Sequence, residues 1–226
     1  MIRTRQLSYS YSKGPTLTFP DVDVPQGGVL LLGGPSGAGK STWLALAAGL
    51  VSATSGLIEV AGQSLGPDGT ALKQGAALDA WRACTIGFLP QKLHLSSALS
   101  VHDNLAMAQW AAGQDQDEPR ITEALSALGV QELALRKPAQ LSGGQALRVA
   151  LARAVLLQPR VILADEPTAS LDDAAAAASL ALLEAASKRE GATLVIATHD
   201  RRVAGHFDQK NGKNSFTSIE FGYRQL

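Results

Sequence analysis

A glycine-rich loop constrains the fold of this chain more than any other feature. It follows the apolar run Val29–Leu32 and leads into the alanine- and leucine-rich stretch Ser41–Leu50. Glycines let a backbone close tightly around an anion, and a helix that begins directly after such a loop points its N-terminus at the same charge. The pattern therefore predicts a buried strand, a phosphate-binding turn and a helix, in that order. The residues of the loop are Gly34, Pro35, Ser36, Gly37, Ala38, Gly39, Lys40 and Ser41.

These eight residues match the P-loop pattern G-x-x-x-x-G-K-[ST] at every position. In such a loop Lys40 reaches the β- and γ-phosphates, the hydroxyl of Ser41 ligates Mg²⁺, and Thr42 adds a phosphate contact. An ordinary glycine turn between a strand and a helix is the alternative interpretation. The loop by itself does not distinguish an ATPase from a kinase or a GTPase.

Strand-like and helix-like segments alternate along most of the chain. Residues 1–33 have a β-rich pattern, and further strands are expected at 57–60, 85–89, 161–164, 192–197 and 216–221. Helices are expected at 41–50, 142–157 and 173–190, together with a helical region at 101–136 that is interrupted near 113–119. Residues 61–77 and the polar tail after Asp208 are expected to be loop-like, with a tight turn at Asn211-Gly212. This alternation predicts a mostly parallel sheet covered by helices.

Composition limits the class of protein. The 226 residues suffice for one α/β domain and not for two full nucleotide-binding domains. Twenty basic and twenty acidic residues cancel, so the basic excess of a nucleic-acid-binding protein is missing and no nucleic-acid partner is expected. A single cysteine, Cys84, favours a reducing cytosol. The sequence has no apolar run of membrane-spanning length and no apolar core of a secretory signal, so any membrane role is expected to act through a spanning partner.

Two carboxylates, Asp165 and Glu166, follow the apolar run Val161–Ala164. The carboxyl ends of strands line the ligand crevice of an α/β sheet. Asp165 suits the Mg²⁺ shell, and Glu166 suits a residue that orients or deprotonates an attacking water. A polar strand end or a helix cap is the alternative, and the glycine-rich loop upstream favours the catalytic interpretation.

The segment Leu141-Ser142-Gly143-Gly144-Gln145 opens a predicted helix between the loop and the acidic pair. It resembles the signature of ABC-type ATPases, and the order of motifs agrees with that family from Tyr11 to Asp200. The resemblance implies one ABC nucleotide-binding domain over residues 1–226, an α/β P-loop NTPase. Its parts would be a mostly parallel core sheet, an antiparallel β subdomain and an α-helical signature subdomain at about 92–158.

The same resemblance implies a mechanism that needs two chains. ATP and Mg²⁺ are the expected cofactors, and hydrolysis of ATP is the expected reaction. Two chains form a head-to-tail homodimer in which each ATP lies between the loop of one chain and the signature of the other. The hydroxyl of Ser142 and the backbone N–H groups of Gly143 and Gly144, at a helix N-terminus, can hold the γ-phosphate of the partner's ATP.

Further positions match the family one at a time. Tyr11 resembles the aromatic residue that stacks on adenine, and Tyr9 is its competitor. Gln91 resembles the glutamine that senses Mg²⁺ and the attacking water and links to the membrane subunit. Asp172 lies in the loop that would cross the dimer interface, and His199 resembles the switch histidine that contacts the γ-phosphate. The resemblance thus implies a catalytic set that is completed by Lys40 and Glu166.

Several segments resemble the exporter branch that handles lipoproteins, macrolides and cell division; they are 86–88, 93–95, 99–101, 103–105 and 163–168. This implies a cytoplasmic subunit, peripheral on the inner face of the cell membrane, that pairs with an integral-membrane transporter subunit. Several positions depart from the pattern of this branch. Pro90, before Gln91, resembles the sequence of metal-chelate importers, and Ala146-Leu147 and Ala169 replace the residues that are usual in the branch. An ATPase that regulates a membrane complex without moving a solute, as in the cell-division relatives, remains the alternative.

Two other classes are disfavoured. Soluble ABC ATPases that act on DNA or ribosomes resemble tandem domains or carry long insertions, for which 226 residues leave no room. A small-molecule kinase would need an acceptor site and a lid that the sequence does not show.

Overall fold

The computed structural model describes residues 1–67, 75–169, 171–211 and 216–221. One sheet consists of the strands β4 (Val29–Gly33), β7 (Ile86–Leu89), β8 (Val161–Asp165), β9 (Thr193–Ala197) and β10 (Thr217–Glu220). These strands are parallel and follow the order β10-β4-β9-β8-β7. The order places the ends of β4, β8 and β9 side by side.

A second sheet is antiparallel. Its strands are β1 (Ile2–Ser10), β2 (Thr16–Thr18), β3 (Val22–Val24), β5 (Ser55–Val60) and β6 (Gln63–Ser64). Strand β1 pairs with β2, β3 and β5, and β6 extends the sheet beyond β5. The helices are α1 (Lys40–Ala47), α2 (Ala76–Thr85), α3 (Val101–Ala111), α4 (Glu118–Ala127), α5 (Gly143–Val155), α6 (Asp173–Glu190) and α7 (Arg201–Asn211). Two short 3₁₀ turns, at Gln131–Leu133 and Pro138–Gln140, lie between α4 and α5.

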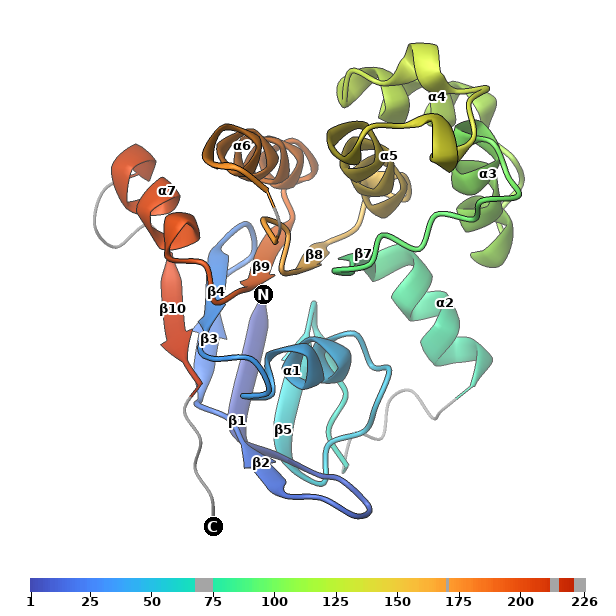
Figure 1. Cartoon of the computed structure of the whole chain (residues 1–226). Coiled ribbons are helices and arrows are strands. Elements are labelled where there is room, and N and C mark those ends of the chain that lie inside the picture. The colour runs from blue at the N-terminus through green and yellow to red at the C-terminus, as the bar shows by residue number, and fades with distance from the viewer. Residues whose placement is uncertain (68–74, 170, 212–215, 222–226) are drawn as a thin grey trace.

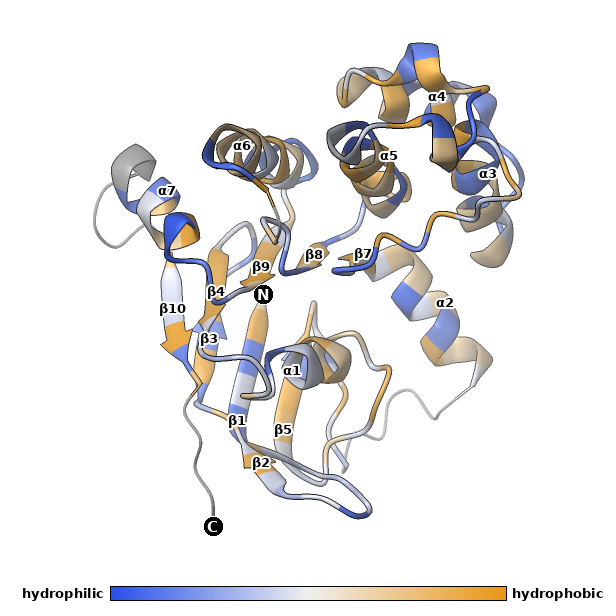
Figure 2. Ribbon diagram, in the orientation of Figure 1, coloured by the Kyte–Doolittle hydropathy of each residue, from blue (hydrophilic) through white to orange (hydrophobic). Residues whose placement is uncertain are grey.

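The parallel sheet is the middle layer, because its side chains are buried on both faces. Leu31 and Ile162 pack in a cluster with the helices α3 to α7. Leu30 and Leu163 point to the opposite face, where α1 and the antiparallel sheet cover them. This two-residue alternation is the geometry of a strand, and apolar side chains on both faces are typical of a buried parallel sheet. Figures 1 and 2 show these apolar strands between the helices and the antiparallel sheet. The predicted fold class is confirmed.

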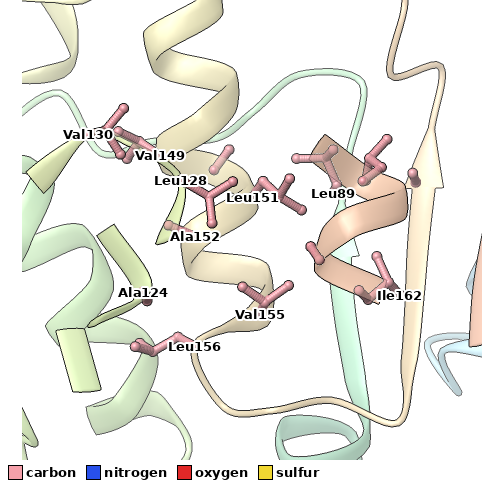
Figure 3. Packing of buried hydrophobic residues seen from close by; sticks show 14 of the residues in the cluster. Leu89, Ala124, Leu128, Val130, Val149, Leu151, Ala152, Val155, Leu156 and Ile162 are labelled. Carbon is pink, nitrogen blue, oxygen red and sulfur yellow. The ribbon is translucent and has the colours of Figure 1, made fainter. Parts of the chain in front are cut away.

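Helix α5 is wedged between the parallel sheet and the helices α3 and α4. Figure 3 shows Leu151 and Val155 on the side of the helix that faces Leu89 and Ile162 of the sheet. On the opposite side, Ala152 belongs to the same buried cluster as residues of the helical layer. Burial on two sides fixes the axis of α5, and with it the position of the predicted signature at the N-terminus of this helix.

Two helices and one short strand were not predicted, the strand being β6 within the stretch 61–77 that was expected to be loop-like. Helix α2 occupies a stretch that was expected to begin as loop and was otherwise unassigned, and its N-cap, Gly75, offers no capping side chain. Helix α7 extends into the tail that was expected to be loop-like, although the fully buried pair Val203 and Phe207 has the i, i+4 spacing of a helix face. The turn expected at Asn211-Gly212 falls partly outside the described residues, and Asn211 itself ends α7.

The other expected elements are present, including the interruption between α3 and α4 and the last strand, β10. Within the described ranges, no helix has the length and apolar character needed to cross a bilayer.

Candidate functional site

The glycine-rich loop joins the end of β4 to the start of α1. Gly34, Gly37 and Gly39 have φ angles of 130°, 81° and 98°, in a region that residues with a Cβ rarely adopt. Space is also limiting: a Cβ on Gly34 would lie 2.5 Å from the carbonyl oxygen of Phe221, and a Cβ on Gly39 would lie 2.8 Å from Leu17. Gly34 is therefore required both by its backbone conformation and by the nearby Phe221 carbonyl, whereas at Gly39 the backbone conformation is the main reason for glycine.

Lys40 is the first residue of α1, and its side chain is only 6% exposed. The ammonium donates hydrogen bonds to the carbonyl oxygens of Gly34, at 2.8 Å, and Pro35, at 3.0 Å. It also lies 3.7 Å from Oε1 of Glu166. The positive charge is thus held at the centre of the loop, close to the carboxylate that follows β8.

Ser41 and Asp165 meet where α1 begins and β8 ends. The hydroxyl of Ser41 donates a 2.8 Å hydrogen bond to Oδ2 of Asp165. Burial raises the pKa of Asp165, and the hydrogen bond from Ser41 opposes that shift. No cluster of three or more His, Cys, Asp or Glu side chains suited to a metal occurs in the described part of the chain. The hydroxyl and the carboxylate still fit Mg²⁺, which commonly takes few protein oxygens together with phosphates and waters.

Glu166 is held in a rare backbone conformation. Its φ is 48°, and its N–H donates a 2.8 Å hydrogen bond to the carbonyl oxygen of Ala197. Its Oε2 accepts a hydrogen bond from the Thr198 hydroxyl at 3.0 Å, and its Oε1 lies 2.8 Å from Nδ1 of His199. Such a conformation persists where the surroundings hold it. The carboxylate is therefore fixed between the ends of β8 and β9.

One cavity of about 290 Å³ gathers residues from the loop, from β1–β2 and from the ends of β8 and β9. It brings together Lys40, Gln91, Glu166 and His199, the four residues predicted as catalytic. The complete lining is Tyr11, Pro15, Leu17, Ser36, Gly37, Gly39, Lys40, Ser41, Thr42, Gln91, Asp165, Glu166 and His199. Pro15 and Leu17 were not predicted, since nothing in their spacing marks them.

Tyr11 and Tyr9 differ in their environments. Tyr11 is 44% exposed and lines the cavity, and its hydroxyl shares a hydrogen bond with the hydroxyl of Thr42. Tyr9 packs against the apolar cluster beneath the sheet and meets Tyr11 edge-on, with ring centroids 4.9 Å apart. The geometry therefore favours Tyr11 over Tyr9 as the residue that offers a ring face to a ligand.

The predicted signature forms the N-terminus of α5. The Ser142 hydroxyl accepts a hydrogen bond from the N–H of Gln145, at 3.3 Å, and Oε1 of Gln145 accepts one from the N–H of Ser142, at 2.9 Å. This reciprocal pair is a capping box. Ser142, Gly143 and Gly144 are exposed. Ser142, Gly144 and Gln145 do not line the 290 Å³ cavity, whereas Gly143 lines a neighbouring hollow of about 170 Å³.

Asp172 is the N-cap of α6, where its Oδ1 accepts a 2.8 Å hydrogen bond from the N–H of Ala175. Its side chain is exposed and lines neither hollow. Ser170, which was expected to share a loop with Asp172, lies outside the described residues. Within one chain the structure therefore does not bring Asp172 or Ser142 to the loop.

A polar cluster beside the cavity was not predicted. Asp200, just after His199, accepts hydrogen bonds from the hydroxyl of Thr168, at 2.7 Å, and from the guanidinium of Arg202, at 2.8 Å. The hydrogen bonds from Arg202, and to a lesser extent the one from Thr168, lower the pKa of Asp200 from 3.8 to about 2. These contacts were not predicted from the sequence, because they join two segments that are 32 positions apart.

The depressed pKa of Asp200 predicts a specific loss of stability in acid. A carboxylate whose pKa is lower in the folded state stabilises the fold above its unfolded pKa, and this contribution is lost as pH falls from about 3.8 towards 2. In Asp200→Asn, the free energy of unfolding that is lost across this pH window should be smaller than in the wild type by about 1 kcal/mol, after allowance for solvent screening. Urea titrations at pH 2 to 5 measure it. Asp208→Asn, an exposed position on α7, is the control; equal slopes in wild type and Asp200→Asn would contradict the assignment.

The chain is similar to known proteins both in sequence and in structure. The family model described as ABC transporter matches residues 17–169. The lipoprotein-releasing system ATP-binding protein LolD of Chromohalobacter salexigens is 36% identical, over 92% of this chain and 89% of its own length. The LolD of Novosphingobium aromaticivorans is 37% identical, over 92% and 94%. A solved dimeric ATP-binding cassette, in a post-hydrolysis state bound to ADP and Pi, has a TM-score of 0.77 and 29% identity, with 91% of both chains covered.

The fold and the loop define an ATP-binding cassette, the class of P-loop ATPase that drives transporters. The chain belongs to the ABC transporter family and is an ATPase of that family. The resemblance to the exporter branch is confirmed by relatives that are themselves lipoprotein-releasing ATP-binding proteins.

Proposed function

We propose that this chain is the ATP-hydrolysing subunit of an exporter that extracts lipoproteins or lipids from a membrane. The cavity beside the glycine-rich loop carries the proposal, because it brings a lysine, two carboxylates and a histidine to one place at the carboxyl ends of the parallel strands. The names of the LolD relatives supply the substrate class.

In this proposal the loop N–H groups and Lys40 hold the β- and γ-phosphates of ATP. Ser41 and Asp165 are the protein ligands of Mg²⁺, which neutralises phosphate charge when bound. Thr42 adds a phosphate contact, and Tyr11 stacks on adenine. The residues between the glycines, Pro35, Ser36 and Ala38, shape the turn. The burial of Lys40, held by two loop carbonyls, supports its role because the ammonium is already positioned before the nucleotide arrives.

Hydrolysis is assigned to the groups at the ends of β8 and β9. Glu166 accepts the proton of the attacking water at its carboxylate, and the contacts from Thr198 and His199 keep that carboxylate oriented. His199 contacts the γ-phosphate, while Gln91, which lines the same cavity, responds to Mg²⁺ and the water. Positioning and charge stabilisation supply most of the rate enhancement in phosphoryl transfer.

The signature residues suggest that each nucleotide site is formed by two chains. Ser142, Gly143 and Gly144 are exposed at the N-terminus of α5, where a helix attracts anions. In a head-to-tail homodimer these residues, with Gln145 holding the cap, meet the γ-phosphate on the loop of the other chain. Asp172 lies at the interface. The solved cassette with a similar fold is described as dimeric, which supports the arrangement.

A transporter role requires a membrane partner. We infer that the chain is cytoplasmic and lies on the inner face of the cell membrane, bound to an integral-membrane transporter subunit and not to nucleic acid. Isolation of the tagged full-length chain from detergent-solubilised membranes tests this. A spanning protein with a large extracytoplasmic domain is expected to co-purify at a fixed ratio. Recovery of the chain without any spanning protein, under conditions that keep known transporter complexes intact, would contradict the proposal.

The same purified complex can distinguish a role in transport from a purely regulatory role. Reconstituted into proteoliposomes, the complex of a lipoprotein exporter is expected to release lipoprotein only with hydrolysable ATP. A complex that hydrolyses ATP but releases nothing would favour the alternative, an ATPase that regulates a membrane protein without transport.

A further inference from the structure

Asp200 forms hydrogen bonds with two segments that flank the candidate catalytic groups, one containing Thr168 and the other containing Thr198. Its Oδ2 accepts a 2.7 Å hydrogen bond from the hydroxyl of Thr168, which is fully buried and lies two residues after Glu166. Its backbone N–H donates a 3.0 Å hydrogen bond to the hydroxyl of Thr198, and that hydroxyl donates to Oε2 of Glu166. A shift of the Asp200 backbone would therefore move the Thr198 hydroxyl, and with it the carboxylate of Glu166, the candidate general base.

Arg202 extends this connection to the start of α6. Its Nε and Nη2 donate to the carboxylate of Asp200 at 3.0 Å and 2.8 Å. Its Nη1 donates to Oδ1 of Asp173 at 2.7 Å, and both terminal nitrogens lie 3.3 Å from the carbonyl oxygen of Leu171. The guanidinium thus bridges the segment after His199 and the residues on either side of Asp172.

We propose that Arg202 is a positioning residue for ATP hydrolysis, which couples the start of α6 to the Glu166–His199 pair. The proposal rests on the function proposed above, in which the same pair faces the γ-phosphate. Through Arg202, a displacement of the Asp172 segment at the dimer interface moves Asp200, and Asp200 moves the Thr198 hydroxyl on Glu166. Hydrolysis in one site is thereby made sensitive to the docking of the other chain.

The chemistry of the bridge requires arginine. A planar guanidinium can bind two carboxylates and a carbonyl at the same time, whereas the ammonium of lysine has no such fork. The Arg202 side chain is 40% exposed and that of Asp173 is 93% exposed. Exposed ion pairs contribute little to stability, while small displacements of catalytic groups have large effects on rate. Loss of the bridge should therefore reduce turnover more than it reduces stability.

Steady-state kinetics of the full-length chain, in complex with its membrane partner, test the proposal. Arg202→Gln should lower kcat for ATP roughly tenfold or more, with KM changed less than about threefold because Arg202 does not touch the nucleotide cavity. Arg202→Lys should fall between Arg202→Gln and wild type. The matched control is Arg201→Gln, since the Arg201 side chain is exposed and makes no hydrogen bond or ion pair with any described residue; this variant should keep the wild-type kcat.

Asp173→Ala removes the acceptor at the other end of the bridge, at a side chain that is 93% exposed. As a single substitution it should lower kcat, and it should lower kcat little further in the Arg202→Gln background, because coupled residues are not additive. If Arg202→Gln fails to fold, the kcat of Asp173→Ala tests the proposal. A wild-type kcat in Asp173→Ala, or equal effects of Arg201→Gln and Arg202→Gln, would overturn the proposal. Failure of the wild-type complex to hydrolyse ATP would instead overturn the function on which the proposal rests.

Discussion

Glu166→Gln is expected to slow ATP turnover by about 10²–10⁴-fold, the range that a positioned general base contributes. The amide keeps the size of the carboxylate and can still accept the hydrogen bond from Thr198, but it cannot accept a proton from water. ATP should still bind, because Lys40, Ser41 and the loop backbone are unchanged. Phosphate release at saturating ATP measures the rate, and equilibrium binding of a fluorescent ATP analogue measures the affinity.

The matched control for this substitution is Glu123→Gln on α4, where the carboxylate is exposed and remote from the cavity. It loses the same charge and should retain wild-type turnover. If Glu166→Gln hydrolysed ATP at more than a tenth of the wild-type rate, Glu166 would not be the general base.

Lys40→Ala should weaken ATP binding and ATP turnover strongly. The ammonium is buried, and its removal takes away the one charge that the loop directs at the phosphates. A hydrogen bond to a charged group is worth about 1.5–3 kcal/mol, so the affinity for ATP should fall by roughly 10- to 100-fold and turnover by at least as much. Isothermal titration with ATP and phosphate release measure the two effects.

Loss of a buried lysine can also disturb the fold, because Glu166 would lose its neighbour at 3.7 Å. The melting temperature and far-UV circular dichroism of Lys40→Ala therefore accompany the binding measurement. Lys137→Ala removes an exposed lysine between α4 and α5 and should bind ATP normally. Wild-type affinity and turnover in Lys40→Ala would exclude the loop as the nucleotide site.

The features that could be predicted from the sequence are those that short segments specify by themselves. The glycine-rich loop combines positive φ angles with a strand before it and a helix after it, and each of these leaves a local pattern. The acidic pair could be placed because parallel strands end at one edge of the sheet. The interpretation of Ser142–Gln145, by contrast, needed the family resemblance, since the capping box that the structure shows is common to ordinary helices.

The features that escaped prediction depend on contacts between distant segments. Helix α2 lacks a capping side chain and is held to the residues that follow α1, where the Arg82 side chain donates to the carbonyl oxygens of Ala48 and Gly49. The bridge from Asp200 through Arg202 to Asp173 spans residues separated by nearly 30 positions. The polar run Asp200-Arg201-Arg202 does not by itself indicate which carboxylate from another segment will contact Arg202. That contact forms because the folded sheet brings α6 and α7 together.

We propose that each nucleotide site is completed by a second chain. The most direct measurement is the mass of Glu166→Gln in solution, by light scattering coupled to gel filtration, with ATP and Mg²⁺ and again with ADP. We expect Glu166→Gln to be a dimer with ATP and a monomer with ADP. We expect a monomer with ATP once Ser142→Glu is added, because it places a negative charge against the γ-phosphate. A Glu166→Gln chain that binds ATP and remains monomeric, or a dimer indifferent to Ser142→Glu, would contradict the proposal.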